Sequence, residues 1–107
     1  MMVDLEAQTQ THLEKASTAE HGRSAELVVQ DGPLRQSVLA LAEGAELSEH
    51  DAPPAASILV LRGAIDVVAE SGTTVLETGM LAEIPHERHS VKAEVDSVFL
   101  LTAVTDI

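Results

Sequence analysis

Three histidines are the side chains in this sequence best suited to chemistry. His50 ends a stretch of alternating residues, and His86 and His89 lie three apart further along the chain. An imidazole can ligate a metal, transfer a proton or orient a ligand through a hydrogen bond. Residues three apart on a strand lie on opposite faces, so we expect His86 and His89 to point apart, with His86 exposed.

The region from residue 24 onward predicts a series of short strands. Apolar and polar residues alternate there, and turn residues such as Gly63, Gly79 and Pro85 recur at short intervals. Eight or nine such segments indicate an antiparallel β-sandwich or barrel. The predicted strands cover residues 27–29, 34–41, 45–50, 57–62, 64–70, 73–77, 80–84, 90–95 and 97–104.

Residues 3–19 predict one amphipathic helix ahead of the strands. Asp4 is a suitable N-cap, and His21-Gly22 is a suitable stop. We expect the helix to pack on the barrel or on a second subunit, with His12 and His21 at the surface. Residues 1–23 are then the helix and its linker, and 24–107 the barrel. The less polar face of the helix carries Leu5, Thr9, His12, Leu13 and Ala16.

Composition excludes several classes of protein. Six Lys and Arg against 18 Asp and Glu leave the 107-residue chain with a net charge of −12, and Phe99 is its one aromatic residue. We therefore expect neither nucleic acid nor a membrane as a partner. The chain has no cysteine, which excludes thiol catalysis and disulfides. No basic and apolar leader opens the sequence, so we expect a cytoplasmic protein with an aliphatic core.

Two motifs give the chain a resemblance to the small single-domain cupins, which are jelly-roll β-barrels. The first motif opens with a glycine, has a histidine six residues later and closes with a second glycine; the second runs from a glycine to a proline and a histidine. The matching residues are Gly44, His50, Gly63, Gly79, Pro85 and His89. The resemblance implies an all-β, cupin-type antiparallel jelly-roll barrel preceded by one N-terminal helix.

The resemblance also implies a metal site that this sequence does not complete. Cupin enzymes hold iron, manganese, nickel or zinc with three His and one Glu, and this chain keeps His50 and His89. Ala52 stands where the second His is expected, and Ala56 (or Ser57 under the longer spacing) where the Glu is expected. We therefore expect no cofactor, the alternative being a Zn, Fe, Mn or Ni site. A further ligand would come from His86, Glu46, Glu83 or Glu87.

The face that the resemblance directs into the barrel is small and mostly apolar. Two imidazoles and one hydroxyl on this face would orient a small organic ligand in a cavity of about 300 Å³ or more. The predicted pocket residues are Ser48, His50, Ala52, Ala56, Ile58, His89 and Val91.

Three functions remain open for such a barrel. The first is a metal-free module that binds a small molecule. The second is a metal-dependent dioxygenase, isomerase or hydrolase that uses His50 and His89. The third is a structural or interaction barrel, its interior packed by Met80, Phe99 and aliphatic side chains. Because two metal ligands are replaced, we favour the first and third, and we expect a homodimer because edge strands need cover.

Overall fold

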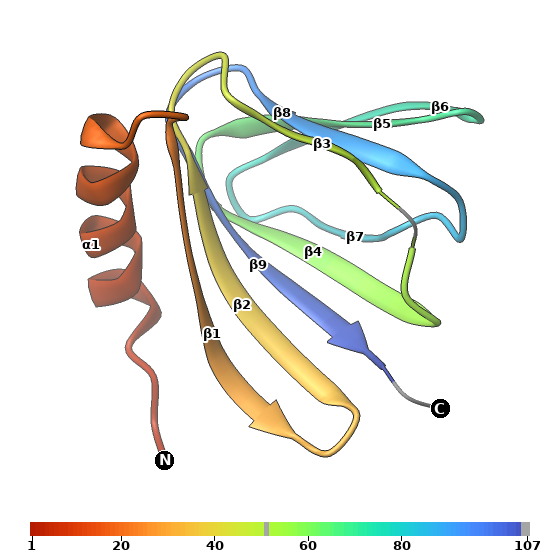
Figure 1. Ribbon diagram of the computed structural model, residues 1–107, viewed down its shortest axis with the longest axis horizontal. Helices are drawn as coiled ribbons and strands as arrows, with labels where there is room; N and C mark the ends of the chain where they lie inside the picture. Colours follow the sequence, from red (N-terminus) through yellow and green to blue (C-terminus); the bar gives the residue numbers. More distant parts are fainter. Residues whose placement is uncertain (51, 106–107) are drawn as a thin grey trace.

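One α-helix and nine β-strands make up the part of the chain that the structure describes (Figure 1). The computed structural model describes residues 1–50 and 52–105, and at residues 49 and 50 it describes the backbone alone. The elements are α1 (Leu5–Thr18), β1 (Arg23–Asp31), β2 (Leu34–Leu41), β3 (Glu46–His50), β4 (Ala55–Arg62), β5 (Ala64–Ala69), β6 (Gly72–Glu77), β7 (Leu81–Glu83), β8 (His89–Ala93) and β9 (Ser97–Val104). Each predicted strand corresponds to one of these.

The strands form two antiparallel sheets that face each other. The larger sheet has the order β1-β2-β9-β4-β7, and the smaller has the order β3-β8-β5-β6. The sheets converge where β4 continues into β5 and β8 into β9, and they diverge where β3 leads to β4 and β7 to β8 (Figure 1). These two ends are called the closed end and the open end of the barrel below. The predicted jelly-roll barrel with one N-terminal helix is confirmed.

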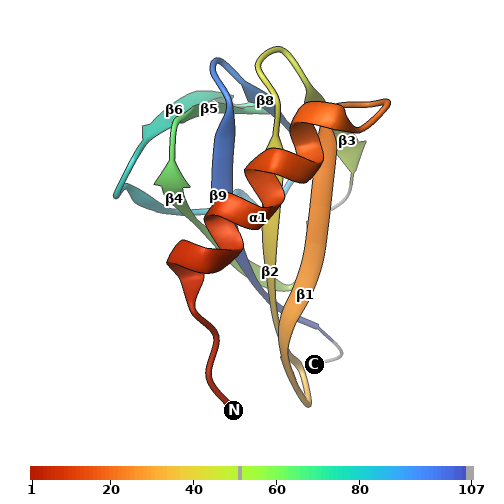
Figure 2. The same ribbon diagram turned by 90° about the vertical axis from the view of Figure 1, so that its left-hand side faces the viewer.

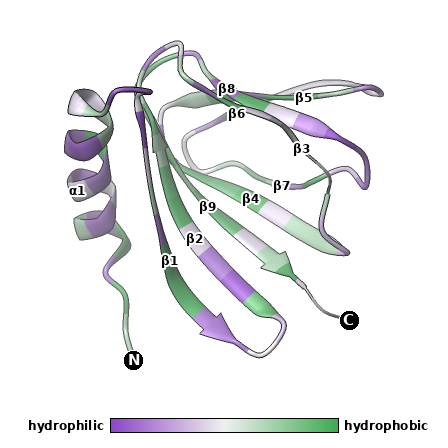
Figure 3. Cartoon of the chain, in the orientation of Figure 1, coloured by the Kyte–Doolittle hydropathy of each residue, from purple (hydrophilic) through white to green (hydrophobic). Residues whose placement is uncertain are grey.

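An aliphatic core fills the space between the two sheets. Strands β4 and β9 are mostly hydrophobic (Figure 3), and their alternate residues point inward because side chains alternate along a strand. Phe99 is buried as predicted, whereas Met80 is 45% exposed, so its predicted place in the core is wrong. The core consists of Leu41, Ile58, Val60, Ile65, Val67, Leu76, Ile84, Val91, Ala93 and Phe99.

Helix α1 packs on the outer face of the larger sheet, across β1, β2 and β9 (Figure 2). Its N-terminus is capped by Asp4, whose carboxylate accepts from the backbone N–H groups of Glu6 and Ala7. The helix ends at Thr18, three residues before the predicted stop. Its buried face contacts Val38, Ala40 and Val98 of the sheet, and this second apolar cluster attaches the helix to the barrel.

His12 is buried, so the prediction that it lies at the surface is wrong. Its side chain is 1% exposed and lies between α1 and β1. Nδ1 is 2.7 Å from the Ser24 hydroxyl, and Nε2 is 3.1 Å from Gln8 Oε1 and 3.2 Å from Glu26 Oε1. Both of those oxygens can only accept, so Nε2 carries a proton and donates it. Two of these partners, Ser24 and Glu26, lie on β1, which the helix meets only after folding. His21 is exposed, as predicted.

Replacing His12 with Ala should lower the free energy of unfolding by about 2–4 kcal/mol. The substitution leaves a cavity and removes the hydrogen bonds that join α1 to β1. Urea denaturation followed by circular dichroism measures the loss. The matched control is His21→Ala, because an exposed substitution should change stability by less than about 0.5 kcal/mol. Equal values for the two variants would contradict the role of His12 as a buried link.

Gly63 forms the closed end of the barrel, where β4 turns into β5. Its φ is 99°, and an added Cβ would collide with Ser97 Oγ and lie 2.6 Å from the Asp96 carbonyl oxygen. Ser97 Oγ accepts from the Ala64 N–H at 3.1 Å, and its hydroxyl donates to the Val95 carbonyl at 2.7 Å. A side chain at residue 63 would therefore push against a buried hydrogen-bonded serine that joins two turns.

Gly63→Ala should destabilise the protein clearly more than Gly79→Ala. Both residues have a positive φ, which costs an alanine about 1–2 kcal/mol. No atom lies within 4 Å of an added Cβ at Gly79, so backbone strain is its whole cost. The collision at Gly63 adds roughly another 1–3 kcal/mol. Chemical denaturation of both variants checks this, and similar losses would show that the contact with Ser97 does not constrain the turn.

Candidate functional site

A β-bulge in β3 changes which residues of this strand face the core. Leu47 pairs with Val91 and His50 pairs with His89, so three residues on β3 span two on β8. Leu47 packs against the core and Ser48 is exposed, so the prediction that Ser48 points into the barrel is wrong. Counting by twos fails across the extra residue of a bulge. The side chain of His50 lies outside the described part, but its backbone stands directly opposite His89.

His89 is the predicted site histidine whose surroundings are described most fully. Its side chain is 3% exposed, as expected for a residue that points inward. Nδ1 lies 3.1 Å from the Glu87 carbonyl oxygen and donates to it. A neutral imidazole that donates through Nδ1 carries its lone pair on Nε2. The backbone of Glu87 therefore selects a tautomer that can accept a hydrogen bond or bind a metal at Nε2.

The described donors do not fit the metal that cupin enzymes hold. Ile58 and Val91 are buried in the core and Ala56 packs against it, and none of these side chains is a metal ligand. Glu46 is exposed and stands opposite Lys92 in the β3–β8 register, on the outer side of the smaller sheet. No three His, Asp or Glu side chains come together among the residues searched, which are the described ones. A catalytic metal site needs about three protein ligands.

The carboxylate of Glu87, another candidate metal ligand, is engaged elsewhere, because it forms hydrogen bonds with the turn between β5 and β6. Its carboxylate accepts from the Ser71 hydroxyl and, at 3.0 Å, from the Ser71 backbone N–H. These hydrogen bonds, the hydroxyl contribution being the larger, lower the pKa of Glu87 below its ordinary value. Residues 84–88 are thereby held against the smaller sheet. The backbone N–H of Ile84 holds them to β4 as well, by donating to the Ala56 carbonyl at 2.9 Å.

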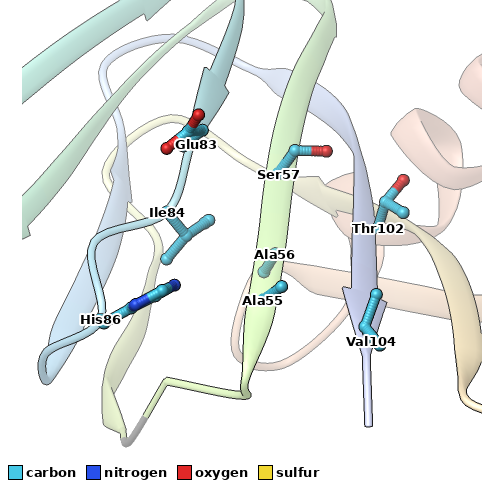
Figure 4. A pocket seen from close by; sticks show the side chains of 8 residues that line it. All are labelled: Ala55, Ala56, Ser57, Glu83, Ile84, His86, Thr102 and Val104. Carbon is cyan, nitrogen blue, oxygen red and sulfur yellow. The ribbon is translucent and has the colours of Figure 1, made fainter.

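An alanine-lined pocket of about 320 Å³ lies at the open end of the barrel (Figure 4). Ile84 and His86 extend toward β4 from the 84–88 segment. Ser57 pairs with both Thr102 and Glu83, while its neighbour Ile58 belongs to the core, so these three polar residues lie on the outer face of the larger sheet. The pocket therefore opens beside the barrel end and not within the interior as predicted. It is lined by Ala55, Ala56, Ser57, Glu83, Ile84, His86, Thr102 and Val104.

Three polar side chains of this pocket have no hydrogen-bond partner among the described residues. They are Ser57, Glu83 and His86; Thr102 differs, because its hydroxyl accepts from Gln36 Nε2 at 3.0 Å. His86 is exposed, as predicted, and it also borders a second hollow of about 610 Å³. That hollow is lined by Ala52, Pro53, Pro54, His86, Glu87 and Arg88. His86 thus stands between two recesses at the open end.

Sequence reasoning reached part of this pocket and missed the rest. Ala56 and His86 were predicted for the site, and Glu83 was considered as a metal ligand. The sequence analysis did not name Thr102 and Val104, which lie on the outer face of β9. A polar residue inside the apolar run 98–104 was the signal available for Thr102.

The comparisons with known proteins rest on structure alone. No protein-family model matches the sequence, and no curated protein matches it. A cupin superfamily protein from Desulfitobacterium hafniense is 19% identical with a TM-score of 0.75, over 85% of this chain and 87% of that one. A conserved Streptococcus pyogenes protein of unknown function is 22% identical with a TM-score of 0.74, over 83% of this chain and 79% of that one.

Enzymes occur among the similar structures too. A salicylate 1,2-dioxygenase from Pseudaminobacter salicylatoxidans is 21% identical with a TM-score of 0.77. The match covers 92% of this chain but only 33% of the dioxygenase. These likenesses show the fold: this small chain has the cupin fold, as its glycines, proline and histidines predicted. Among the described residues, no helix is long and apolar enough to cross a membrane.

Replacing Ser71 with Ala should raise the pKa of Glu87 toward its ordinary value. The variant removes the hydroxyl donor, which is the larger of the two causes that lower this pKa, and keeps the backbone donor. Carboxylate-detected NMR over an acid pH titration measures the midpoint directly. The wild-type contact stabilises the fold above the unfolded pKa of Glu87 and is lost as the pH falls through the lowered value. The control Ser17→Ala should leave the midpoint in place, and an unchanged midpoint in Ser71→Ala would disprove the contact.

Proposed function

We propose that the protein binds a small organic molecule, without catalysis, in the pocket at the open end of the barrel. The observation that carries the proposal is an apolar pocket of about 320 Å³ that includes three polar side chains with no hydrogen-bond partner among the described residues. Ligand sites are concave and mostly apolar, with a few polar groups that set orientation, and their volumes begin near 300 Å³. This pocket has that size and composition.

The packing of the barrel supports this location over the interior. The core cluster occupies the space between the sheets, and Ile84 closes it toward the open end. Ala55 then leaves room outside that core, where a larger side chain would fill it. His50 and His89 face each other in the β3–β8 register. Their contact with a ligand remains a prediction.

A metal-dependent enzyme is the weaker candidate. The dioxygenase activity belongs to a protein of which this chain matches one third. The ligand set of cupin enzymes is not found among the described side chains, where Ala52 and Ala56 replace two of its members. The described side chains therefore do not support a metal-dependent reaction of the cupin type. The expected homodimer likewise remains a prediction.

Fragment binding followed by NMR tests the proposal. We expect members of a fragment library of small rings and short chains to shift the amide signals of residues 55–57, 83–86 and 102–104. Ala55→Leu should abolish these shifts, because the longer side chain fills the half-buried mouth of the pocket. Chemical-shift mapping of the wild type and the variant measures the effect directly.

The matched control is Ala25→Leu, an identical substitution at an exposed residue of β1. This variant should bind the same fragments as the wild type. Fragments that bind Ala55→Leu equally well, or whose shifts map to other residues, would contradict the proposal. So would a self-association that buries residues 55–57 and 102–104, which analytical ultracentrifugation of the same samples detects.

A further inference from the structure

We propose that the ligand of this pocket has a short apolar body and a single cationic amine. This inference rests on the proposed binding function and adds the chemical class of the ligand. It follows from three properties of the pocket: the sign of its charge, the kind of hydrogen bonds it has to offer and the character of its walls.

The charge that lines the pocket is negative. Among the described lining residues Glu83 is the one that is always charged near neutral pH, and none is a Lys or Arg. The whole chain carries a net charge of −12, so the potential around the pocket has the same sign as its own carboxylate. Fields of this kind raise the local concentration of cations and lower that of anions. A carboxylate or phosphate ligand is therefore disfavoured.

The hydrogen-bonding groups point to the same class. An ammonium group has three N–H donors and no acceptor. The pocket has three groups that can accept and that have no partner among the described residues: the Glu83 carboxylate, the Ser57 hydroxyl oxygen and, when its ring is uncharged, one nitrogen of His86. A ligand carboxylate could accept from the Ser57 hydroxyl or from His86, but it would face the Glu83 carboxylate, which repels it and offers it no donor.

The remaining walls set the other end of the ligand. Ala55, Ala56, Ile84 and Val104 present only methyl and methylene groups. A volume of about 320 Å³ suits a short alkyl chain or one small ring, not a nucleotide or an oligosaccharide. The apolar body would gain from leaving water, while the amine stays at the mouth beside Glu83, which is exposed.

Titrations with three probes of equal length test the inference. The probes are n-hexylammonium, hexan-1-ol and hexanoate, added to the labelled full chain while amide signals are recorded. We expect hexylammonium to bind about fivefold more tightly than hexanol, as is typical of one partly exposed charge pair. Its shifts should map to residues 55–57, 83–86 and 102–104. Hexanoate should not shift these signals.

The variant Glu83→Gln keeps the shape of the side chain and removes its charge. It should weaken hexylammonium binding about fivefold and leave hexanol binding unchanged. The matched control is Glu77→Gln, which changes the net charge equally at an exposed residue outside the pocket. Higher ionic strength should reduce the preference for the amine in the wild type, because salt screens exposed charges.

The outcomes separate this inference from the proposed function. Equal binding of hexylammonium and hexanol at the pocket would overturn the amine and leave the binding site in place. So would hexanoate binding in the pocket itself, or equal effects of Glu83→Gln and Glu77→Gln. If neither the amine nor the alcohol, nor any fragment, shifts the signals of the pocket, the inference and the proposed function both fail.

Discussion

Phe99 and nine aliphatic side chains pack between the two sheets, and this packing is the constraint on which our proposed binding site depends. These residues fill the space from the closed end, where Gly63 and Ser97 join two turns, to Ile84 near the open end. A close-packed interior leaves no room for a ligand. An internal cavity large enough for one would lower the stability of the whole domain. We therefore place the proposed binding site at the open end, where His86 borders two recesses.

The open end has a defined shape because its longest connecting segment is held at several points. The Ile84 N–H donates a hydrogen bond to Ala56 of β4, and the Glu87 carboxylate accepts from Ser71 in the β5–β6 turn. The His89 ring donates to the backbone carbonyl of Glu87. His86 lies between these fixed residues and is itself exposed. A side chain on a restrained segment can meet a ligand without a large loss of conformational entropy. The restraint also fixes the tautomer of His89.

Much of the fold could be predicted from the sequence, whereas the site could be predicted only in part. Alternation, turn residues and the glycine spacing are local signals, and they located the helix and every described strand. The inward direction of Ser48 could not be derived, since a bulge in β3 depends on pairing with β8. The burial of His12 depends on Ser24 and Glu26, which meet it only in the folded chain. For the same reason the pocket, built from β4, β9 and the 84–88 segment, had no continuous signature.

We propose that the protein binds an organic molecule at the open end and no metal beside His89, because Ala52 and Ala56 stand where the cupin resemblance expects two of the ligands. The most direct test is elemental analysis of the untagged protein, purified without chelator and then incubated with zinc, iron, manganese or nickel and desalted. We expect no stoichiometric metal in the wild type and the same metal content in a His89→Ala variant. Near-stoichiometric metal in the wild type that is absent from His89→Ala would contradict the proposal of a metal-free domain and show that the domain is a metalloprotein.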